Sequence, residues 1–150
     1  MIVAFCGHSD VTDPDDVRRW LEHTVDDLIQ RDAKTFYLGG YGSFDRLAAS
    51  VLHKVSASNP FVESLLVFPY LNREVEDGLY DGTIYPPLEN VPKRLAIIKR
   101  NEWMVDHADV IVAYVLHDWG GASTMFRYAI RKNKEIIRYA SVSPNRKIEH

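Results

Sequence analysis

The chain has 150 residues, of which 46% are hydrophobic and 26% are charged, an ordinary composition for one globular domain. Its formal net charge is −3 and it contains no basic run, which argues against a nucleic-acid backbone as the partner. The single cysteine cannot form an internal disulfide, and the apolar stretch at residues 1–6 is too short for a signal peptide or a membrane span. We therefore expect a cytoplasmic protein.

The start of the chain predicts a strand followed by a helix. Residues 2–6 are apolar and end in a Gly-His-Ser turn at residues 7–9, as expected for a short buried strand. A helix is predicted over about residues 14–30, because Asp13 can cap it and proline suits the first helical position. The aspartates at residues 13–16 are thus interpreted as a helix start rather than as a calcium or magnesium site.

A second strand at residues 35–38 ends in a glycine-rich turn at residues 39–43, and an amphipathic helix follows. Asp45 lies in the first turn of that helix, where it would either satisfy the helix dipole or accept a hydrogen bond from a ribose hydroxyl. The segment GYGSFD begins like a dinucleotide-binding fingerprint, but Asp45 stands where the third glycine belongs, which argues against a standard NAD enzyme. The lack of a lysine at the P-loop spacing argues against a Walker-type nucleotide triphosphatase.

The middle of the chain shows less regular patterning. Residues 65–68 predict a third strand that Pro69 ends, but residues 70–92 show no sustained period. Such a long segment is interpreted either as a solvated, irregular insertion with one helical turn or as a lid over a crevice. In the second case Tyr80 or Tyr85 would stack on a flat ring.

The stretch at residues 99–124 predicts a helix, a buried strand and the start of a second helix. Asn101 is the only polar residue on the apolar face of the first helix. It therefore either ties down the backbone of a neighbouring element or faces a ligand crevice, with Arg100 beside it. Residues 109–116 form a near-continuous apolar run, typical of a strand covered on both faces. The glycines at residues 120–121 then open the next helix and leave free N–H groups where an anion would bind.

The last elements are a helix over residues 122–132, a strand over residues 135–139 and a flexible tail over residues 141–150. Strands and helices therefore alternate, which predicts a Rossmann-like α/β fold. This is a three-layer sandwich in which helices cover both faces of a parallel sheet of about five strands, in the order 3-2-1-4-5. Residues 1–140 would form one domain. The glycine turns are expected to converge on one crevice at the carboxyl ends of the strands, where the strand order reverses.

Cysteine and histidine side chains near this crevice allow further chemistry. Cys6 is close to His8 in the sequence and is interpreted either as a small buried residue or as a nucleophile beside an imidazole. His117 would act as an acid or base, or would be a solvated loop residue. The six histidines show no spacing typical of zinc ligands.

Three segments, FCGHS, LGGYGSFDRLAA and KRNEWMVDHADVIVAYVLHDWGGAST, resemble the SLOG superfamily of Rossmann-like domains. The resemblance spans about residues 2–139. It is strongest to the bacterial YpsA-like proteins of unknown function, which carry similar GH, GG-x-G-x-D and RN-x-WM motifs. It implies a Rossmann-like sheet of about five to six strands, with a pocket that binds a nucleotide or a nucleotide-derived ligand.

The same superfamily includes the LOG-type phosphoribohydrolases, which cleave the N-glycosidic bond of a nucleoside monophosphate with an arginine and a glutamate. Their R-K-x-x-M segment resembles residues 100–104, which keep the arginine as Arg100. Their P-G-G-x-G-T-x-x-E motif compares with residues 119–127, where Arg127 replaces the glutamate. A guanidinium opposes the positive charge that develops on the ribose, so this departure argues against the hydrolase. Arg127 would instead hold a phosphate or face solvent.

The first functional hypothesis is a sensor or regulatory module that binds a nucleoside phosphate or an ADP-ribose-like molecule, with no certain cofactor and no metal. The second is a nucleotide N-glycosidase in which Asp45, Asp118 or Glu102 supplies the missing carboxylate. The third is a protein-interaction module with a vestigial crevice. DNA binding, known in the DprA branch of the superfamily, is disfavoured by the acidic balance, whereas the helix faces allow a homodimer.

The expected site combines the glycine turns with a few polar side chains. The amides of the glycines and of Ser123 would take a phosphate, with which Arg100 would pair. His8, Asp45 and Asn101 would orient the ribose or the base. The residues expected to bind the ligand are Gly7, His8, Ser9, Gly39, Gly40, Gly42, Ser43, Asp45, Arg100, Asn101, Gly120, Gly121, Ser123 and Thr124.

Overall fold

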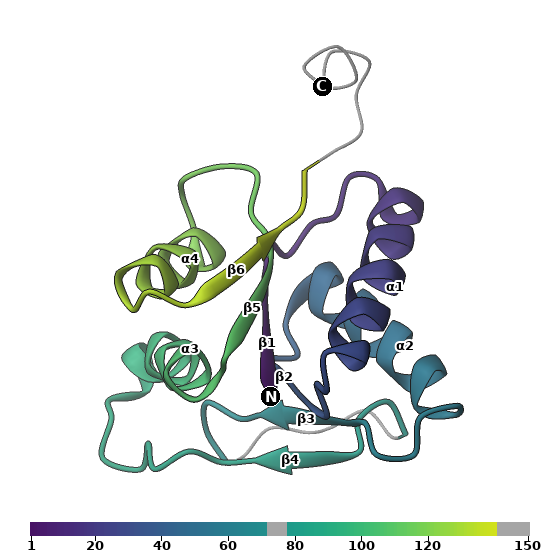
Figure 1. Cartoon of the computed structure of the whole chain (residues 1–150). Coiled ribbons are helices and arrows are strands. Elements are labelled where there is room, and N and C mark those ends of the chain that lie inside the picture. The colour runs from purple at the N-terminus through teal and green to yellow at the C-terminus, as the bar shows by residue number, and fades with distance from the viewer. Residues whose placement is uncertain (72–77, 141–150) are drawn as a thin grey trace.

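A six-stranded parallel sheet in the order β4-β3-β2-β1-β5-β6 forms the centre of the computed structural model (Figure 1). The structure describes residues 1–71 and 78–140. The strands are β1 (Ile2–Gly7), β2 (Thr35–Leu38), β3 (Glu63–Val67), β4 (Gly82–Ile84), β5 (Val110–Tyr114) and β6 (Glu135–Arg138). The helices are α1 (Pro14–Gln30), α2 (Gly42–Ser56), α3 (Ala96–His107) and α4 (Gly121–Arg131), with a 3₁₀ turn at Lys93–Leu95 before α3.

Helices cover both faces of the sheet, α1 and α2 on one side and α3 and α4 on the other (Figure 1). Strand β1 shows how the sequence produces the two layers, because its side chains point alternately to opposite faces. Val3 and Phe5 pack into the core under α1 and α2, while Ala4 and Cys6 pack into the core under α3 and α4. The predicted three-layer Rossmann-like sandwich is therefore confirmed.

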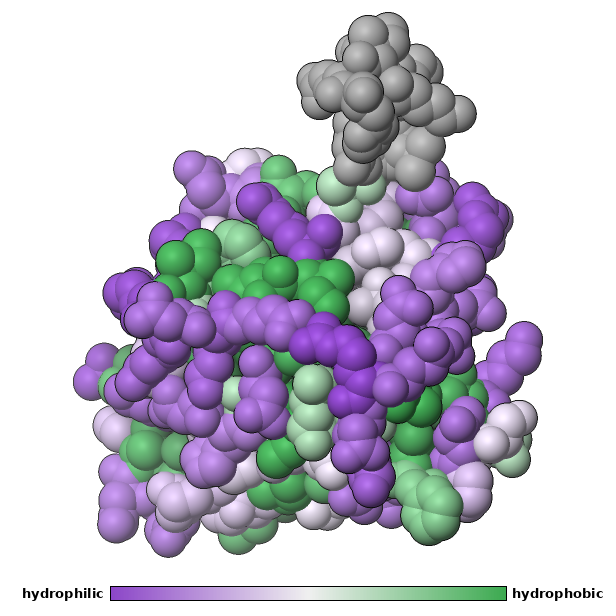
Figure 2. Space-filling model, viewed as in Figure 1, coloured by the Kyte–Doolittle hydropathy of each residue, from purple (hydrophilic) through white to green (hydrophobic). Residues whose placement is uncertain are grey.

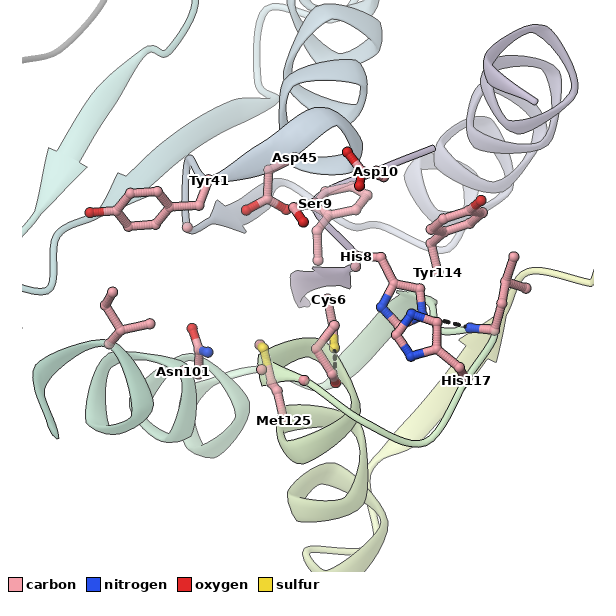
Figure 3. A pocket seen from close by; sticks show the side chains of 18 of the residues that line it. Cys6, His8, Ser9, Asp10, Tyr41, Asp45, Asn101, Tyr114, His117 and Met125 are labelled. Atoms are coloured by element: carbon pink, nitrogen blue, oxygen red, sulfur yellow. Dashed lines mark hydrogen bonds between the residues drawn. The ribbon is translucent and has the colours of Figure 1, made fainter. Parts of the chain in front are cut away.

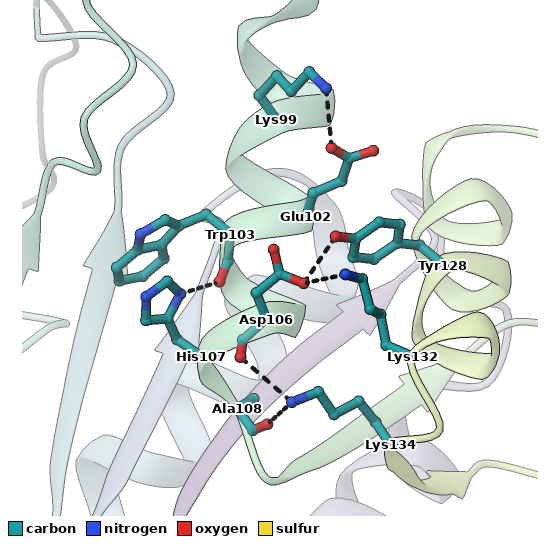
Figure 4. Close-up of polar contacts among 9 residues, drawn as sticks. All are labelled: Lys99, Glu102, Trp103, Asp106, His107, Ala108, Tyr128, Lys132 and Lys134. Atoms are coloured by element: carbon teal, nitrogen blue, oxygen red, sulfur yellow. Dashed lines mark hydrogen bonds and ion pairs between the residues drawn. The ribbon is translucent and has the colours of Figure 1, made fainter.

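Polar contacts join the C-terminal ends of α3 and α4 (Figure 4). The hydroxyl of Tyr128 donates to Asp106 Oδ1 at 2.8 Å, and Lys132 Nζ lies 3.7 Å from the same oxygen. Lys134 Nζ donates to the backbone oxygen of Ala108 at 2.9 Å. These contacts hold the two helices side by side.

The start of α1 follows the sequence prediction. The side chain of Asp13 accepts a hydrogen bond from the amide of Asp16 at 3.3 Å, and Pro14 is the first helical residue. The acidic cluster is therefore a helix start, as predicted.

The predicted order of five strands is confirmed, and the structure adds β4 at the edge of the sheet beside β3. This strand lies within residues 70–92, where no strand was predicted, because three residues are too short to show a period of two. Residues 72–77 and the predicted tail at 141–150 lie outside the described residues. The lid and the domain boundary therefore stay predictions.

Hydrophilic residues cover most of the face seen in Figure 2, with hydrophobic residues showing between them. Several large apolar side chains are nevertheless exposed, and some of them lie near the carboxyl ends of β1 and β5. The exposed residues there are Ile97, Leu116 and Trp119. No helix in the described ranges is long and apolar enough to cross a membrane.

Candidate functional site

A cavity of about 570 Å³ opens at the carboxyl ends of β1 and β5, where the strand order reverses (Figure 3). Its walls come from the turn after β1, the start of α2, one side of α3 and the turn between β5 and α4. The volume lies within the range of about 300 to 1,000 Å³ that is typical of small-molecule sites. The structure thus brings together the turns that the strand order predicted to converge.

Most of the residues expected to bind a ligand line this cavity, but some in or beside the first turns of α2 and α4 do not. The expected residues that line it are Gly7, His8, Ser9, Gly39, Asp45, Arg100, Asn101, Gly120 and Gly121. The expected residues that are not part of its wall are Gly40, Gly42, Ser43, Ser123 and Thr124.

Sequence reasoning missed several wall residues. Tyr41 and Trp119 each adjoin a glycine in a turn, and an aromatic residue in that position was the signal that could have revealed them. Met104 and Met125 also line the cavity, but their helical spacing is equally typical of core residues. Tyr80 packs against the core under α1 and α2 instead, and neither it nor Tyr85 is part of the wall.

The glycines near β1 and β2 allow close packing. A Cβ at Gly7 would overlap the ring of Phe44, and a Cβ at Gly42 would lie 2.5 Å from the Cα of Ser9. Gly42 also has a φ of +83°, a conformation that side chains disfavour. These glycines let the first turn of α2 lie directly against the end of β1.

Several amides of the turn between β2 and α2 already have acceptors within the protein. The amide of Gly40 donates to Asp45 Oδ2 at 3.0 Å, and the amide of Ser43 donates to the backbone oxygen of Ser9 at 2.7 Å. This turn therefore holds its own carboxylate, although its glycine amides were expected to hold a phosphate.

The N-terminus of α4 is open to the cavity. Gly120, with a φ of +91°, precedes the helix and provides no side-chain cap, and the first turn contains no acidic residue. A Cβ added at Gly120 or Gly121 would meet no heavy atom within 4 Å. The first amides of a helix have no intrahelical acceptor and lie at the positive end of its dipole, so an anion fits here.

Arg127, which the resemblance compares with the glutamate of the LOG-type motif, folds back over the same turn. Its Nη1 donates to the backbone oxygen of Asp118 at 3.0 Å and to Ser123 Oγ at 2.7 Å. The hydroxyl of Thr124 donates to the backbone oxygen of Gly120 at 3.1 Å. These side chains stabilise the turn from outside the cavity wall.

Three stacked rings form another part of the wall. The ring of His117 lies between those of His8 and Trp119, with centroid distances of 3.7 and 3.6 Å. The amide of Leu116 donates to His8 Nε2 at 2.8 Å, which assigns the proton of a neutral His8 to Nδ1. Burial lowers the pKa of His8, and the nearby His117 and Arg138 lower it further. The stack ends at Trp119, which is 66% exposed.

Asp45 is a buried carboxylate in the wall of the cavity and is only 8% exposed. Burial raises the pKa of this carboxyl to about 6, although Arg100 and the amides of residues 39–41 lower it. Its Oδ1 is buried and has no hydrogen-bond partner. Among the described residues, His117 Nδ1 is the other buried side-chain nitrogen or oxygen without a hydrogen-bond partner. His117 also lines the cavity.

Arg100 is more deeply buried than expected, at 2% exposure. Its Nη1 donates to the backbone oxygens of Gly39 and Val67, at 2.9 and 2.8 Å, and its Nε donates to Asn101 Oδ1 at 2.8 Å. Asn101 lines the cavity, the position expected in one of its two interpretations. Arg100 ties down the ends of β2 and β3.

No family model matches the chain, and no curated protein matches it either. Solved structures do share its Rossmann-like fold. The structural-genomics target TM1055 has a TM-score of 0.63 at 14% identity, over 90% of this chain and 71% of that one. DNA processing protein A from Helicobacter pylori, which binds single-stranded DNA, has a TM-score of 0.66 at 14% identity, over 99% of this chain and 72% of that one.

The Moco carrier protein of Chlamydomonas is a third such structure, with a TM-score of 0.57 at 12% identity over 99% of this chain and 80% of that one. At these identities the similarity concerns the fold. The fold is thus shared among proteins whose names indicate different ligands.

Cys6 shows the features of a small buried residue. It is 1% exposed, its thiol donates to the backbone oxygen of Ala122 at 3.2 Å, and burial raises the pKa of the thiol. A thiol that stays protonated is a poor nucleophile, so the geometry favours the first of the two interpretations.

The remaining polar groups near the cavity do not gather into a metal site. In residues 1–71 and 78–140, no group of three or more His, Cys, Asp and Glu side chains could hold a metal ion. Glu102 pairs with Lys99 at 3.2 Å and Asp118 is exposed, and neither is part of the wall. Of the three carboxylates considered for catalysis, Asp45 alone lines the cavity.

Proposed function

We propose that this chain is a binding module for a phosphorylated nucleoside, of the nucleoside phosphate or ADP-ribose class, and that the bound ligand regulates a partner protein. The observation that carries the proposal is the uncapped N-terminus of α4, which opens into the cavity through Gly120 and Gly121. The resemblance of the glycine turns to the SLOG superfamily, and to its YpsA-like branch in particular, supports the same ligand class.

The phosphate would bind at the turn between β5 and α4. The amides of Gly121 and Ala122 begin the helix and have no intrahelical acceptor. A phosphate would accept hydrogen bonds from them at the positive end of the helix dipole, and the first turn carries no carboxylate that would repel it.

The base would bind on the ring stack beside that turn. Trp119 adjoins Gly120 in the sequence and is the exposed end of the stack of His8, His117 and Trp119. Stacking of a base on an aromatic side chain contributes about 1 to 3 kcal/mol and tolerates different bases. A nucleotide therefore matches the two features of the cavity that lie next to each other.

Substitution of Gly121 tests the phosphate site. A side chain fits there without a clash, so both Gly121→Asp and Gly121→Asn are expected to fold. The two side chains have nearly the same size, but the carboxylate would repel a phosphate. We expect Gly121→Asp to weaken nucleotide binding about tenfold or more relative to Gly121→Asn, measured by isothermal titration calorimetry. Equal affinities of the two variants would contradict the proposed phosphate site.

A thermal-unfolding screen identifies the ligand class. The panel comprises AMP, ADP, ATP, ADP-ribose, NAD, cyclic nucleotides and inorganic phosphate. A ligand at 100 times its dissociation constant adds about 2.7 kcal/mol, which raises the midpoint of a domain of this size by about 5 to 11 °C. A panel without any shift would favour the protein-interaction module with a vestigial crevice.

A second candidate is a nucleotide N-glycosidase, favoured by one observation, the carboxyl group of Asp45 in the wall of the cavity. A carboxylate near the ribose would stabilise the positive charge that develops as the base leaves. Chromatography of the incubated nucleotides tests this candidate. Free base that the wild type releases, and that Asp45→Asn does not, would support it. If nucleotides bind but none of them releases free base, the result would favour the binding module over the enzyme.

A further inference from the structure

Asp45 lines the cavity, and one of its two carboxylate oxygens lacks a hydrogen-bond partner. Asp45 Oδ2 accepts a hydrogen bond from the amide of Gly40 at 3.0 Å, whereas Oδ1 is buried without a partner. A buried carboxylate oxygen is poorly tolerated unless a donor meets it. Asp45 lines the cavity, so a bound molecule can supply that donor.

The donor is not the phosphate group of a nucleotide. Asp45 is negatively charged above its pKa of about 6 and repels a phosphate. The nearby guanidinium of Arg100 reduces this repulsion, but burial has the larger effect on the pKa of Asp45 and raises it. The phosphate therefore belongs at the start of α4 and a neutral hydrogen-bond donor at Asp45.

The sugar is the part of a nucleotide that fits this description. The base is assigned to the stack that contains His8 and His117, and Figure 3 shows His117 and Asp45 on different sides of the pocket. With the phosphate and the base at one side, the ribose hydroxyls are the donors left to reach Asp45. A hydroxyl donates well to a carboxylate.

We infer that Asp45 selects the ligand by accepting a hydrogen bond from a ribose hydroxyl, so that the site prefers ribonucleotides to their deoxy analogues. This inference rests on the proposed function, since it assumes that a nucleotide is the ligand. It adds the residue that sets specificity for the sugar.

Calorimetric titration of matched ligands tests the inference. The probes are the four ribonucleoside 5′-monophosphates with their 2′-deoxy and 3′-deoxy analogues, at about pH 7.5, where a carboxyl with a pKa of about 6 is ionised. We expect the wild type to bind at least one deoxy analogue about tenfold or more weakly than its parent, as for loss of a hydrogen bond to a charged group. Equal binding of a ribonucleotide and both analogues would overturn the inference while leaving the proposed function intact.

Two variants at the same position sharpen the test. In Asp45→Ala the preference for the ribonucleotide should disappear, with the deoxy analogues binding as in the wild type to within about threefold. Asp45→Asn keeps an acceptor for the amide of Gly40 and should show a reduced preference for the ribonucleotide. This second variant provides the test if the alanine variant fails to fold. The matched control is Glu22→Gln, an exposed carboxylate on α1, which should keep the full preference.

A preference that survives in both Asp45 variants would contradict the inference, because another residue would then recognise the sugar. Failure of every nucleotide to bind the wild type would overturn the proposed function itself, and with it the role of Asp45.

Discussion

At the scale of single residues, Asp45 and Arg100 are buried opposite charges beneath one cavity. Arg100 lowers the pKa of Asp45, but burial has the larger effect and raises it to about 6. The guanidinium of Arg100 also donates to two backbone oxygens, which holds it at the ends of β2 and β3. A carboxylate kept in such an unfavourable position is typical of binding sites, where function limits stability.

This burial predicts a change in stability with pH. Folding raises the pKa of Asp45 from an ordinary 3.8 to about 6, so the folded protein binds this proton more tightly than the unfolded chain between those values. The contribution of Asp45 to the free energy of unfolding therefore falls as the pH rises through this range. The full difference corresponds to about 3 kcal/mol.

Asp45→Asn removes the charge at every pH. We therefore expect its free energy of unfolding, measured by urea denaturation, to exceed that of the wild type by up to about 3 kcal/mol at about pH 7.5. At about pH 4 the two should differ little. The control Glu22→Gln should show no such pH-dependent gain. A stability difference that does not change with pH would contradict the raised pKa.

The residues around Asp45 also show where sequence reasoning reached its limit. Asn101 could be predicted to face inward because it interrupts an apolar face. Arg100 could not be predicted to be the more buried of the two. Its long side chain reaches carbonyl groups 61 and 33 positions away in the chain, and no local pattern encodes such contacts.

At the scale of elements, the glycine turns perform different tasks although they look alike in the sequence. Gly7 and Gly42 allow α2 to approach β1, whereas Gly120 and Gly121 leave the start of α4 open. Periodicity and glycine content predicted each turn, but the neighbours that distinguish packing from binding come from distant parts of the chain. The short strand β4 escaped prediction for a different reason, since three residues carry no period.

Alanine substitutions should separate these tasks. Gly7→Ala would bring a Cβ into the ring of Phe44, which is fully buried and stacks on Tyr114 at 5.5 Å. We expect a loss of about 1 to 3 kcal/mol or more in the free energy of unfolding, as for overpacked cores. Gly121→Ala meets open space and should change stability by only about 0.5 kcal/mol. Urea denaturation measures both, and similar losses in the two variants would contradict the assignment.

At the scale of the whole molecule, the order of the strands determines where ligands bind. Strand order and alternating elements were predictable because a right-handed crossover leaves few arrangements of a parallel sheet. The cavity followed from the same rule, since the order reverses between β1 and β5. The ligand itself did not follow, because proteins with this fold, such as TM1055, the Moco carrier protein and DNA processing protein A, share only 12 to 14% of the sequence.

The net charge bears on the single-stranded DNA that DNA processing protein A of Helicobacter pylori binds. A chain with a formal charge of −3 gains little from releasing the counterions of a DNA backbone. We expect a labelled oligothymidylate to bind no more tightly than about 10⁻⁴ M at physiological salt, measured by fluorescence anisotropy. Submicromolar binding that nucleotides do not displace would contradict this expectation and would favour DNA as the partner.

The ring stack has a practical consequence for spectroscopy. The chain contains three tryptophans, and two of them contact residues outside the cavity wall: Trp20 packs on Tyr139, and Trp103 stacks on His107. Trp119 is the tryptophan that lines the cavity, and it is exposed to solvent. A base stacked on its ring should therefore quench the emission of Trp119. A base that stacks on Trp119 should therefore be detectable as a fall in intrinsic fluorescence, without an attached dye.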